Sequence, residues 1–297
     1  MSIYSYTILL AVVEQGGLAK AASVLNLSPS AVSHAISKIE EEFEFPLFNR
    51  IKNRLVLTPD GEQIIPFIQN AVNASNLLEQ KVAQIRGLTQ GVLRIGVINS
   101  IAVNWLPDIL TKYCKEFPFV HIQIVQNGYD KLIQGVAASQ LDIAFVSHTA
   151  VRHRDMAFQF IPLHKDRLMC VSPKDFQPEG KNYVTTEEIR NMNLIFHEAG
   201  DEIDITTFLK DANLGNKSDF SIFNEQSLVS MVKCGFGHSI MPELSLKGLI
   251  TDDVNIYPIV PMANRELGII STHPKYLTPA AQKMIQHIQQ YAISHNL

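Results

Sequence analysis

Small polar side chains recur on one side of a predicted helix in the stretch SPSAVSHAISKIEEEF, residues 28–43. They are Ser30, Ser33, His34, Ser37 and Lys38. The opposite side is apolar at spacings of four, three and four, which is the pattern of a buried helix face. Its residues are Val32, Ile36, Ile39 and Phe43. Hydroxyls and an imidazole held out from a helix can hydrogen-bond to base edges and phosphates in the major groove of DNA. The alternative is a helix face that meets only water.

Two short helices must position these side chains. Ser28 suits the N-cap of the second helix and Pro29 suits its first turn, so the start of that helix is well defined. An apolar stripe upstream predicts a first helix, whose alanines are small enough to let the second helix cross closely. The stripe consists of Leu18, Ala21, Ala22 and Leu25. Because only Asn26, Leu27 and Ser28 separate the two predicted helices, the sequence predicts a helix-turn-helix.

Basic residues follow in the stretch FNRIKNRLVL, residues 48–57, which predicts two short strands around a Lys-Asn turn. Its cations suit phosphates or the minor groove, as in a wing. Acidic residues lie at the far end of the preceding helix, so we expect that end to face water. They are Glu40, Glu41, Glu42 and Glu44. The predicted DNA-binding residues are Ser28, Ser30, Ser33, His34, Ser37, Lys38, Arg50, Lys52 and Arg54.

One long helix is predicted over residues 58–88, with Thr58 as its cap and Pro59 in its first turn. Its apolar residues alternate at three and four, and polar residues between them leave only a narrow seam. We expect this seam to form a dimer, and packing on its own domain is the alternative. The predicted dimerisation residues are Ile68, Ala71, Leu78, Val82 and Ile85.

From Gly91 onward, predicted strands alternate with predicted helices, which favours a parallel, doubly wound sheet. The first strands are expected at 92–98, 120–126 and 141–146, with helices at 103–117 and 129–138 between them. Two chain crossings, near Pro162 and Arg265, predict two lobes with a cleft between them.

Three domains follow from these patterns. We expect a DNA-binding domain in residues 1–58, a linker helix with a hinge in 59–90, and a regulatory domain in 91–297. Within the regulatory domain, lobe I takes about 91–161 and 268–297, and lobe II about 162–267.

Polar residues at predicted strand ends are candidates for ligand binding, because open α/β sheets bind ligands at the carboxyl ends of their strands. They are Asn99, Ser100, Asn127, Ser147, His148, His197 and Asn224. Neutral donors and helix N-termini favour a small organic acid. If Glu198 or Asp201 points into the cleft, an amino acid or a similar zwitterion is favoured instead. If both acids cap the next helix and face water, the prediction of a small organic acid stands.

The runs AAxxLNLSPSAVSHAISKIEEEF, PLFNR and LVLTPDG, starting at Ala21, resemble the N-terminal signature of LysR-type transcriptional regulators. The likeness continues with GVLRIGV at Gly91 and SMVKCGFGHSIMPE at Ser230. This resemblance implies a multidomain protein with a winged helix-turn-helix DNA-binding domain, a long dimerising linker helix and a two-lobed α/β regulatory domain folded like a periplasmic binding protein. It also implies a dimer of dimers on promoter DNA and a small-molecule effector.

One position departs from the family pattern. Glu44 stands where family members usually place Gly after the recognition helix. A left-handed residue at that helix end would be strained with Glu.

Other classes of protein are disfavoured. The chain has 297 residues, 46% of them hydrophobic, and a formal charge of −4, which argues against coating nucleic acid non-specifically. Its three cysteines are far apart, so we expect no disulfide framework, no metal site and no peroxide-sensing cysteine pair. No P-loop or GxGxxG motif is present, and we expect no cofactor. An enzyme using cleft carboxylates lacks a nucleophile motif or P-loop to support it. A solute-binding protein without a regulatory role would need export, and the N-terminus predicts a cytoplasmic protein.

Overall fold

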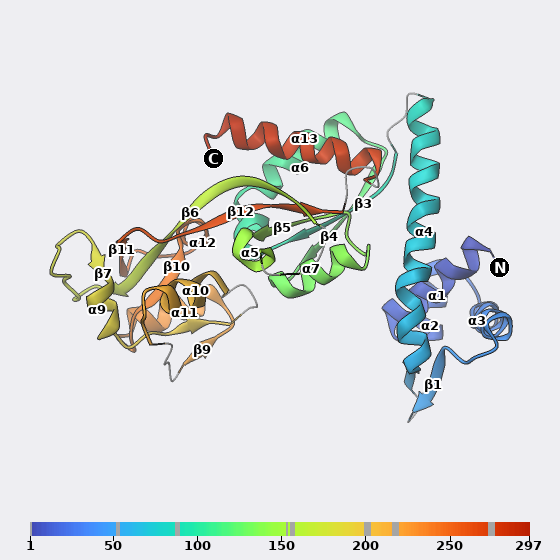
Figure 1. Cartoon of the computed structure of the whole chain (residues 1–297), viewed down its shortest axis with the longest axis horizontal. Helices are drawn as coiled ribbons and strands as arrows, with labels where there is room; N and C mark the ends of the chain where they lie inside the picture. Colours follow the sequence, from blue (N-terminus) through green and yellow to red (C-terminus); the bar gives the residue numbers. More distant parts are fainter. Residues whose placement is uncertain are drawn as a thin grey trace. The chain divides into compact units, whose positions relative to one another are not determined.

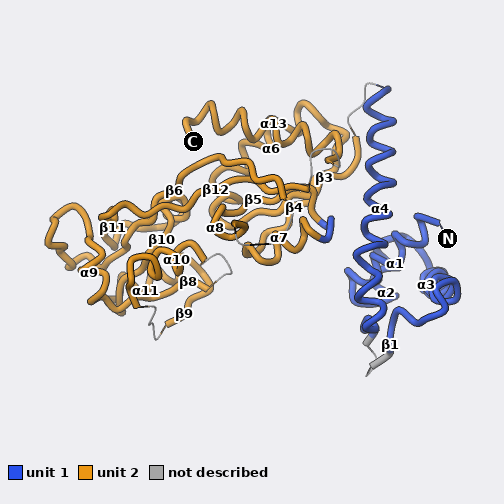
Figure 2. The backbone as a smooth tube through the Cα atoms, viewed as in Figure 1, with its two compact units in different colours: residues 1–88, 138–140 blue, residues 89–137, 141–297 orange. Residues whose placement is uncertain are grey.

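The structure, a computed structural model, describes residues 2–51, 54–86, 90–152, 154, 158–198, 203–215, 220–272 and 277–297, and for residues 50, 51 and 54 it describes only the backbone. The chain forms two compact units, residues 1–88 with 138–140, and residues 89–137 with 141–297 (Figure 2). Each unit has its own hydrophobic core. No helix among the described residues is both long enough and apolar enough to cross a membrane.

The first unit contains three short helices, a two-stranded wing and one long helix (Figure 1). Its elements are α1 (Ile3–Gln15), α2 (Leu18–Leu25), α3 (Pro29–Phe43), β1 (Phe48–Ile51), β2 (Arg54–Leu57) and α4 (Pro59–Ile85). Helices α1, α2 and α3 share a core that includes Leu9, Ala22 and Val32. The first turn of α4 packs closely on the chain before the wing, since a Cβ atom at Gly61 would collide with the backbone oxygen of Leu47.

The second unit is built on one eight-stranded sheet in the order β4-β3-β5-β12-β6-β11-β7, with β10 also paired to β6. Its strands are β3 (Gly91–Val97), β4 (Val120–Gln126), β5 (Ile143–Ser147), β6 (Gln159–Pro173), β7 (Val184–Thr185), β10 (Ser239–Pro242), β11 (Val254–Val260) and β12 (Asn264–Ser271). Short strands β8 (Phe196–His197) and β9 (Ser221–Ile222) form a separate parallel pair.

The expectation of a parallel, doubly wound sheet is correct for only part of the sheet. Strand β3 is parallel to β4 and β5, but β12 runs antiparallel to both β5 and β6. The reason is topological, because β6 carries the chain out of the first lobe and β12 carries it back. Figure 1 shows these two strands running together from the β3 to β5 group to the β10 and β11 group. They contain Pro162 and Arg265, where the two crossings were predicted.

The two lobes have separate cores. Lobe I is packed around Ile95, Phe145 and Met284, while two clusters around Leu209 and Val229 fill lobe II. The helices of this unit are α5 (Asn99–Asn104), α6 (Leu106–Glu116), α7 (Tyr129–Ala137), α8 (His148–Val151), α9 (Thr186–Arg190), α10 (Ile203–Asp211), α11 (Glu225–Lys233), α12 (Glu243–Leu246) and α13 (Pro279–Ser294).

One predicted helix is divided in the structure. The helix expected at 103–117 is replaced by α5 and α6, which meet at Trp105. Pro107 lies in the first turn of α6, where its missing backbone N–H costs no hydrogen bond, so the second helix begins there.

Candidate functional site

The helix α3 has one buried face and one polar face. Val32, Ile36 and Ile39 are buried in the core of the first unit. The predicted DNA-binding residues of this helix lie outside that core: Ser30, His34, Ser37 and Lys38 are exposed and Ser33 is half-buried. The polar face is therefore accessible to a ligand as large as a DNA duplex.

The turn between α2 and α3 is short and well defined. Asn26 adopts a left-handed conformation with φ of 54°, and its backbone N–H donates to the last carbonyls of α2. Ser28 caps α3, because its hydroxyl accepts from the backbone N–H of Ala31 at 3.1 Å, and it lies 2.9 Å from the hydroxyl of Ser30. Ser28 thus has a structural role in addition to the predicted contact with DNA.

The wing is an antiparallel pair in which Arg50 lies opposite Leu55 and Ile51 lies opposite Arg54. This pairing confirms the two predicted short strands, while the predicted Lys-Asn turn lies outside the described residues. Lys52 lies outside the described residues, and for Arg50 and Arg54 the structure gives only the backbone position.

Of the acidic residues near the end of α3, Glu40 differs from its predicted role in facing water, whereas Glu44 is exposed as predicted. Glu40 is half-buried, and its Oε1 accepts from the backbone N–H groups of Leu47 at 2.7 Å and Phe48 at 3.1 Å. It therefore holds the start of the wing against α3. Glu44 ends the helix in the left-handed region, with φ of 62° and ψ of 19°. Glu44 thus adopts the left-handed conformation that glycine, the usual residue of the family at this position, adopts without strain.

The apolar seam of α4 is exposed over most of its length. Leu78 is 66% exposed and Ile85 is 86% exposed. Ile68 instead packs in the core of the first unit and is not available to a partner helix. Its neighbour Phe67, 69% exposed, continues the exposed stripe, at a spacing of eleven residues from Leu78.

A buried ion pair joins the two crossing strands at the boundary between the lobes. Arg265 and Asp166 are each only 1% exposed, and the Nε and Nη2 atoms of Arg265 lie 2.8 Å from Oδ2 of Asp166. The other carboxylate oxygen accepts from the backbone N–H of Leu244 at 3.0 Å. Arg265 also reaches lobe I, because Nη2 donates to Oγ of Ser100 at 3.0 Å and Nη1 donates to the hydroxyl of Tyr129 at 3.4 Å.

Two carboxyl groups of lobe II contact lobe I across the same boundary. Oδ2 of Asp204 accepts from the hydroxyl of Tyr129 at 3.1 Å. Oε2 of Glu225 accepts from Nδ2 of Asn99 at 2.5 Å, and Oδ1 of Asn99 in turn accepts from Gln126 at 3.0 Å. Burial raises the pKa of Asp204, opposed by the charge of Arg265 and by hydroxyl groups that face the carboxyl.

The predicted ligand-binding residues fall into two groups. One group lies near the start of α11 and consists of Asn99, His197 and Asn224. Nε2 of His197 lies 2.9 Å from the carbonyl oxygen of Phe223. Asn224 caps α11, whose first residue is Glu225. Ser100 and Ser147 gather near Arg265 and Asp204.

Two further candidates lie apart from these groups. His148 lies 3.6 Å from Glu266 and against the ring of Phe160, and Asn127 is exposed, with its side chain accepting from the N–H of Gly128. Glu198 is exposed, and Asp201 lies outside the described residues.

The sequence patterns missed five residues of the lobe boundary as site residues: Tyr129, Asp166, Asp204, Glu225 and Arg265. The only local signal was the presence of charged residues within otherwise apolar strands or at the start of helices.

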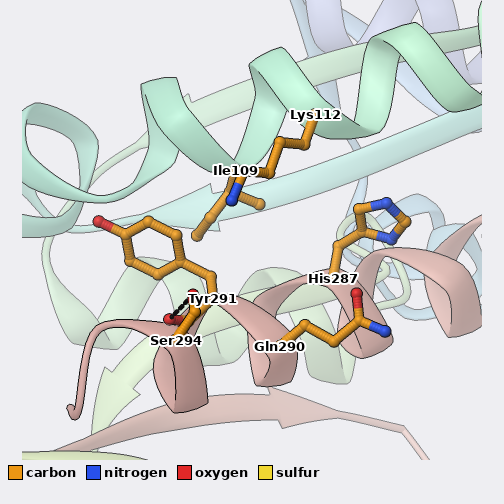
Figure 3. Close-up of a pocket in the computed structure, with 6 residues that line it drawn as sticks. All are labelled: Ile109, Lys112, His287, Gln290, Tyr291 and Ser294. Carbon is orange, nitrogen blue, oxygen red and sulfur yellow. Dashed lines mark hydrogen bonds between the residues drawn. The ribbon is translucent and has the colours of Figure 1, made fainter.

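A shallow pocket lies elsewhere on lobe I, between α6 and α13 (Figure 3). Its lining residues are Ile109, Lys112, His287, Gln290, Tyr291 and Ser294. None of the predicted ligand-binding residues lines it.

Comparison with known proteins agrees with this arrangement. A family model described as "LysR substrate binding domain" matches residues 86–292, and another, "Bacterial regulatory helix-turn-helix protein, lysR family", matches residues 4–62. The HTH-type transcriptional regulator SoxR of Arthrobacter sp. (strain TE1826) is 28% identical over 97% of this chain and 97% of its own length. The uncharacterized HTH-type transcriptional regulator YvbU of Bacillus subtilis (strain 168) is 23% identical over 96% of this chain and 97% of its own.

Solved structures show the same fold. Full-length OxyR from Pseudomonas aeruginosa has a TM-score of 0.78 at 18% identity, covering 98% of this chain and 94% of that one. Full-length CbnR, complexed with its target DNA, has a TM-score of 0.65 at 17% identity, covering 98% of this chain and 100% of that one.

The fold and the exposed recognition helix thus define a winged helix-turn-helix transcription regulator with a two-lobed effector-binding domain. The chain belongs to the LysR family. Its relatives are named as transcription regulators, and the chain is a DNA-binding regulator and not an enzyme.

Proposed function

We propose that α3 reads the operator from the major groove, with Ser33, His34 and Lys38 facing the bases. Ser28, Ser30 and Ser37 lie beside them at the protein–DNA interface, and Arg50, Lys52 and Arg54 of the wing hold phosphates or the minor groove. The observation that carries this proposal is the accessible polar face of α3, which stands opposite its buried apolar face. Short side chains there let the helix approach the base edges closely.

The test is fluorescence anisotropy with a DNA fragment that the wild-type protein selects from a random pool. Ser33→Ala with His34→Ala is expected to lose about 1–3 kcal/mol on this fragment and little on scrambled DNA. The matched control is Ser230→Ala with His121→Ala, which removes the same groups from exposed sites of the second unit. Unchanged affinity and preference in the recognition-helix variant would refute the assignment.

We also propose that α4 forms the dimer through its exposed apolar stripe. The stripe comprises the exposed large residues Phe67, Leu78, Val82 and Ile85 with the half-buried Ala71, and it takes Phe67 in place of Ile68. A protein that exposes such a row of large apolar side chains gains by burying it against a second copy. Two copies would set two recognition helices at a separation that suits successive major grooves, about 34–36 Å apart. A dimer of dimers on an interrupted palindrome extends the same arrangement.

Glutamates on the stripe test this contact. Leu78→Glu with Val82→Glu places charge in the proposed seam, so sedimentation is expected to show smaller species with weaker DNA binding. Asn70→Glu with Gln84→Glu adds the same charge to exposed positions beside the stripe and is expected to leave assembly unchanged. If the seam variant assembles as fully as its control, α4 does not carry the dimer in this way.

We further propose that a small organic acid, or an amino acid-like molecule, binds between the lobes and changes operator binding. Polar groups from both lobes meet there, and Asn99, Ser100 and Ser147 lie at the carboxyl ends of strands. A thermal-shift screen of metabolites tests this, because a ligand specific for the folded state raises its melting temperature. A regulator of promoter DNA acts where chromosomal DNA is, so we place the protein in the cytoplasm.

A further inference from the structure

Asp204 is a lobe II residue whose carboxyl group lies in a polar site on lobe I. It lies in the first turn of α10 and is only 5% exposed, yet the neighbours of its carboxyl group come from lobe I. Tyr129 of α7 donates to Oδ2 at 3.1 Å. The hydroxyls of Ser147, at the end of β5, and of Thr149, in α8, also face the carboxyl. A carboxylate from one lobe thus occupies a set of donors on the other.

The donors are arranged so that their hydrogens point to an anion. Tyr129 accepts from Nη1 of Arg265 at 3.4 Å, which leaves its own hydrogen for Oδ2 of Asp204. Ser147 accepts from the backbone N–H of Ala150 at 3.3 Å, so its hydrogen is also available to an acceptor. The site therefore offers neutral donors next to a buried guanidinium, which is the chemistry that recognises a carboxylate.

Asp204 fills this site imperfectly. Its Oδ1 atom is buried and makes no hydrogen bond of normal geometry, although the neighbouring hydroxyls face the carboxyl group. Arg265 makes its ion pair with Asp166, through Nε and Nη2, each 2.8 Å from Oδ2 of Asp166. A buried acceptor without a donor is costly, typically about 1–3 kcal/mol. A free carboxylate that engages the donors with both oxygens would satisfy the site better.

The same arrangement recurs nearby on the boundary. Glu225, 6% exposed at the start of α11, accepts from Asn99 of lobe I at 2.5 Å. Both contacts therefore pair a carboxylate of lobe II with a neutral donor of lobe I, at residues that follow the ends of β3 and β4.

We propose that lobe I carries a carboxylate-binding site that the protein fills with its own Asp204, and that an effector carboxylate enters this site by displacing Asp204. The inference rests on the proposed binding of an effector between the lobes, and it narrows the effector to a molecule with a carboxylate. It also predicts the conformational change. A ligand that replaces Asp204 removes a contact between the lobes and therefore favours their separation.

Formate is the probe, because Asp204→Ala removes only the carboxylate group that formate would replace. The full-length protein is melted while Trp105, the one tryptophan of the chain and buried in lobe I, reports unfolding. About 100 mM sodium formate, compared with sodium chloride at equal ionic strength, is expected to raise the melting temperature of Asp204→Ala by about 2–4 °C. The wild type is expected to respond less than Asp204→Ala, since formate must displace Asp204 from the site. Asp204→Asn is expected not to respond, since its amide fills the site.

Two further variants make the result decisive. Tyr129→Phe in the Asp204→Ala background removes a donor and is expected to abolish the formate response, and Asp204→Ser replaces Asp204→Ala if the alanine variant does not fold. No response in the emptied site, or an equal response in all variants, overturns the proposal. Operator binding by the wild-type protein is measured in parallel. A missing formate response with intact operator binding refutes only the role of Asp204, whereas a wild-type protein that does not bind DNA refutes the proposed function.

Discussion

The buried pair Arg265–Asp166 is expected to be the most sensitive point of the regulatory domain. Arg265→Met keeps a long apolar stem and removes the charge, which leaves Asp166 buried with a single hydrogen bond, from the N–H of Leu244. Breaking a buried pair by removing one partner costs about 3–5 kcal/mol, because an uncompensated charge remains. For a domain of this size each kcal/mol lowers the melting temperature by about 2–4 °C, so we expect a fall of about 6–20 °C.

The assay is thermal melting followed by the fluorescence of Trp105, which reports this domain alone. Arg167→Ala is the matched control, on the paired strand β6 next to Asp166. Its ion pair with Glu243 is half-exposed and is expected to contribute less than about 1 kcal/mol. Arg265→Met combined with Asp166→Leu is expected to recover most of the loss, because no charge is left buried. If Arg265→Met melts like the control, or if the double variant is as unstable as the single one, the reasoning is wrong.

Three further outcomes are expected. Glu44→Gly should stabilise the first unit by about 0.5–1 kcal/mol in urea unfolding by relieving the left-handed residue, while Glu41→Gly, inside the exposed face of α3, should destabilise it by a similar amount; equal effects would contradict this. Glu40→Ala should cost about 1–3 kcal/mol, against little for Glu41→Ala, because two backbone N–H groups lose their acceptor. Burial raises the pKa of Asp204 in the folded state above the ordinary pKa of an aspartate. The free energy of unfolding should therefore fall as the pH rises above that ordinary pKa, because the folded protein must then ionise a buried carboxyl group. Asp204→Asn should remove this pH-dependent loss of stability. If the urea midpoint of the variant falls with pH as steeply as that of the wild type, the role given to Asp204 is wrong.

The recognition helix was predictable from sequence because its determinants are local. Ser28, Pro29 and the spacing of Val32, Ile36 and Ile39 fix its start and its buried face within a few residues of one another. The winged helix-turn-helix and the succession of strands and helices in the regulatory domain follow from the same kind of local pattern, and the family resemblance completed the architecture.

The lobe boundary was not predictable in this way. Arg265 and Asp166 are 99 residues apart in the chain and meet only because β12 pairs with β6. Asp204 and Tyr129 are 75 residues apart in the chain, and no local sequence periodicity predicts a contact between them. The seam of α4 shows a second limit, because an apolar spacing cannot distinguish a residue that packs in its own core, such as Ile68, from one left for a partner, such as Phe67.

The most direct test of the central claim, that α3 reads the operator bases, is to repeat the selection from a random DNA pool with the Ser33→Ala, His34→Ala protein. Wild type is expected to enrich two half-sites related by two-fold symmetry. The double variant should retain non-specific affinity and lose base preference at matching positions in both half-sites, since losing a base contact relaxes specificity there. Enrichment of the same sequence by both proteins, with the same preference at every position, would contradict the account.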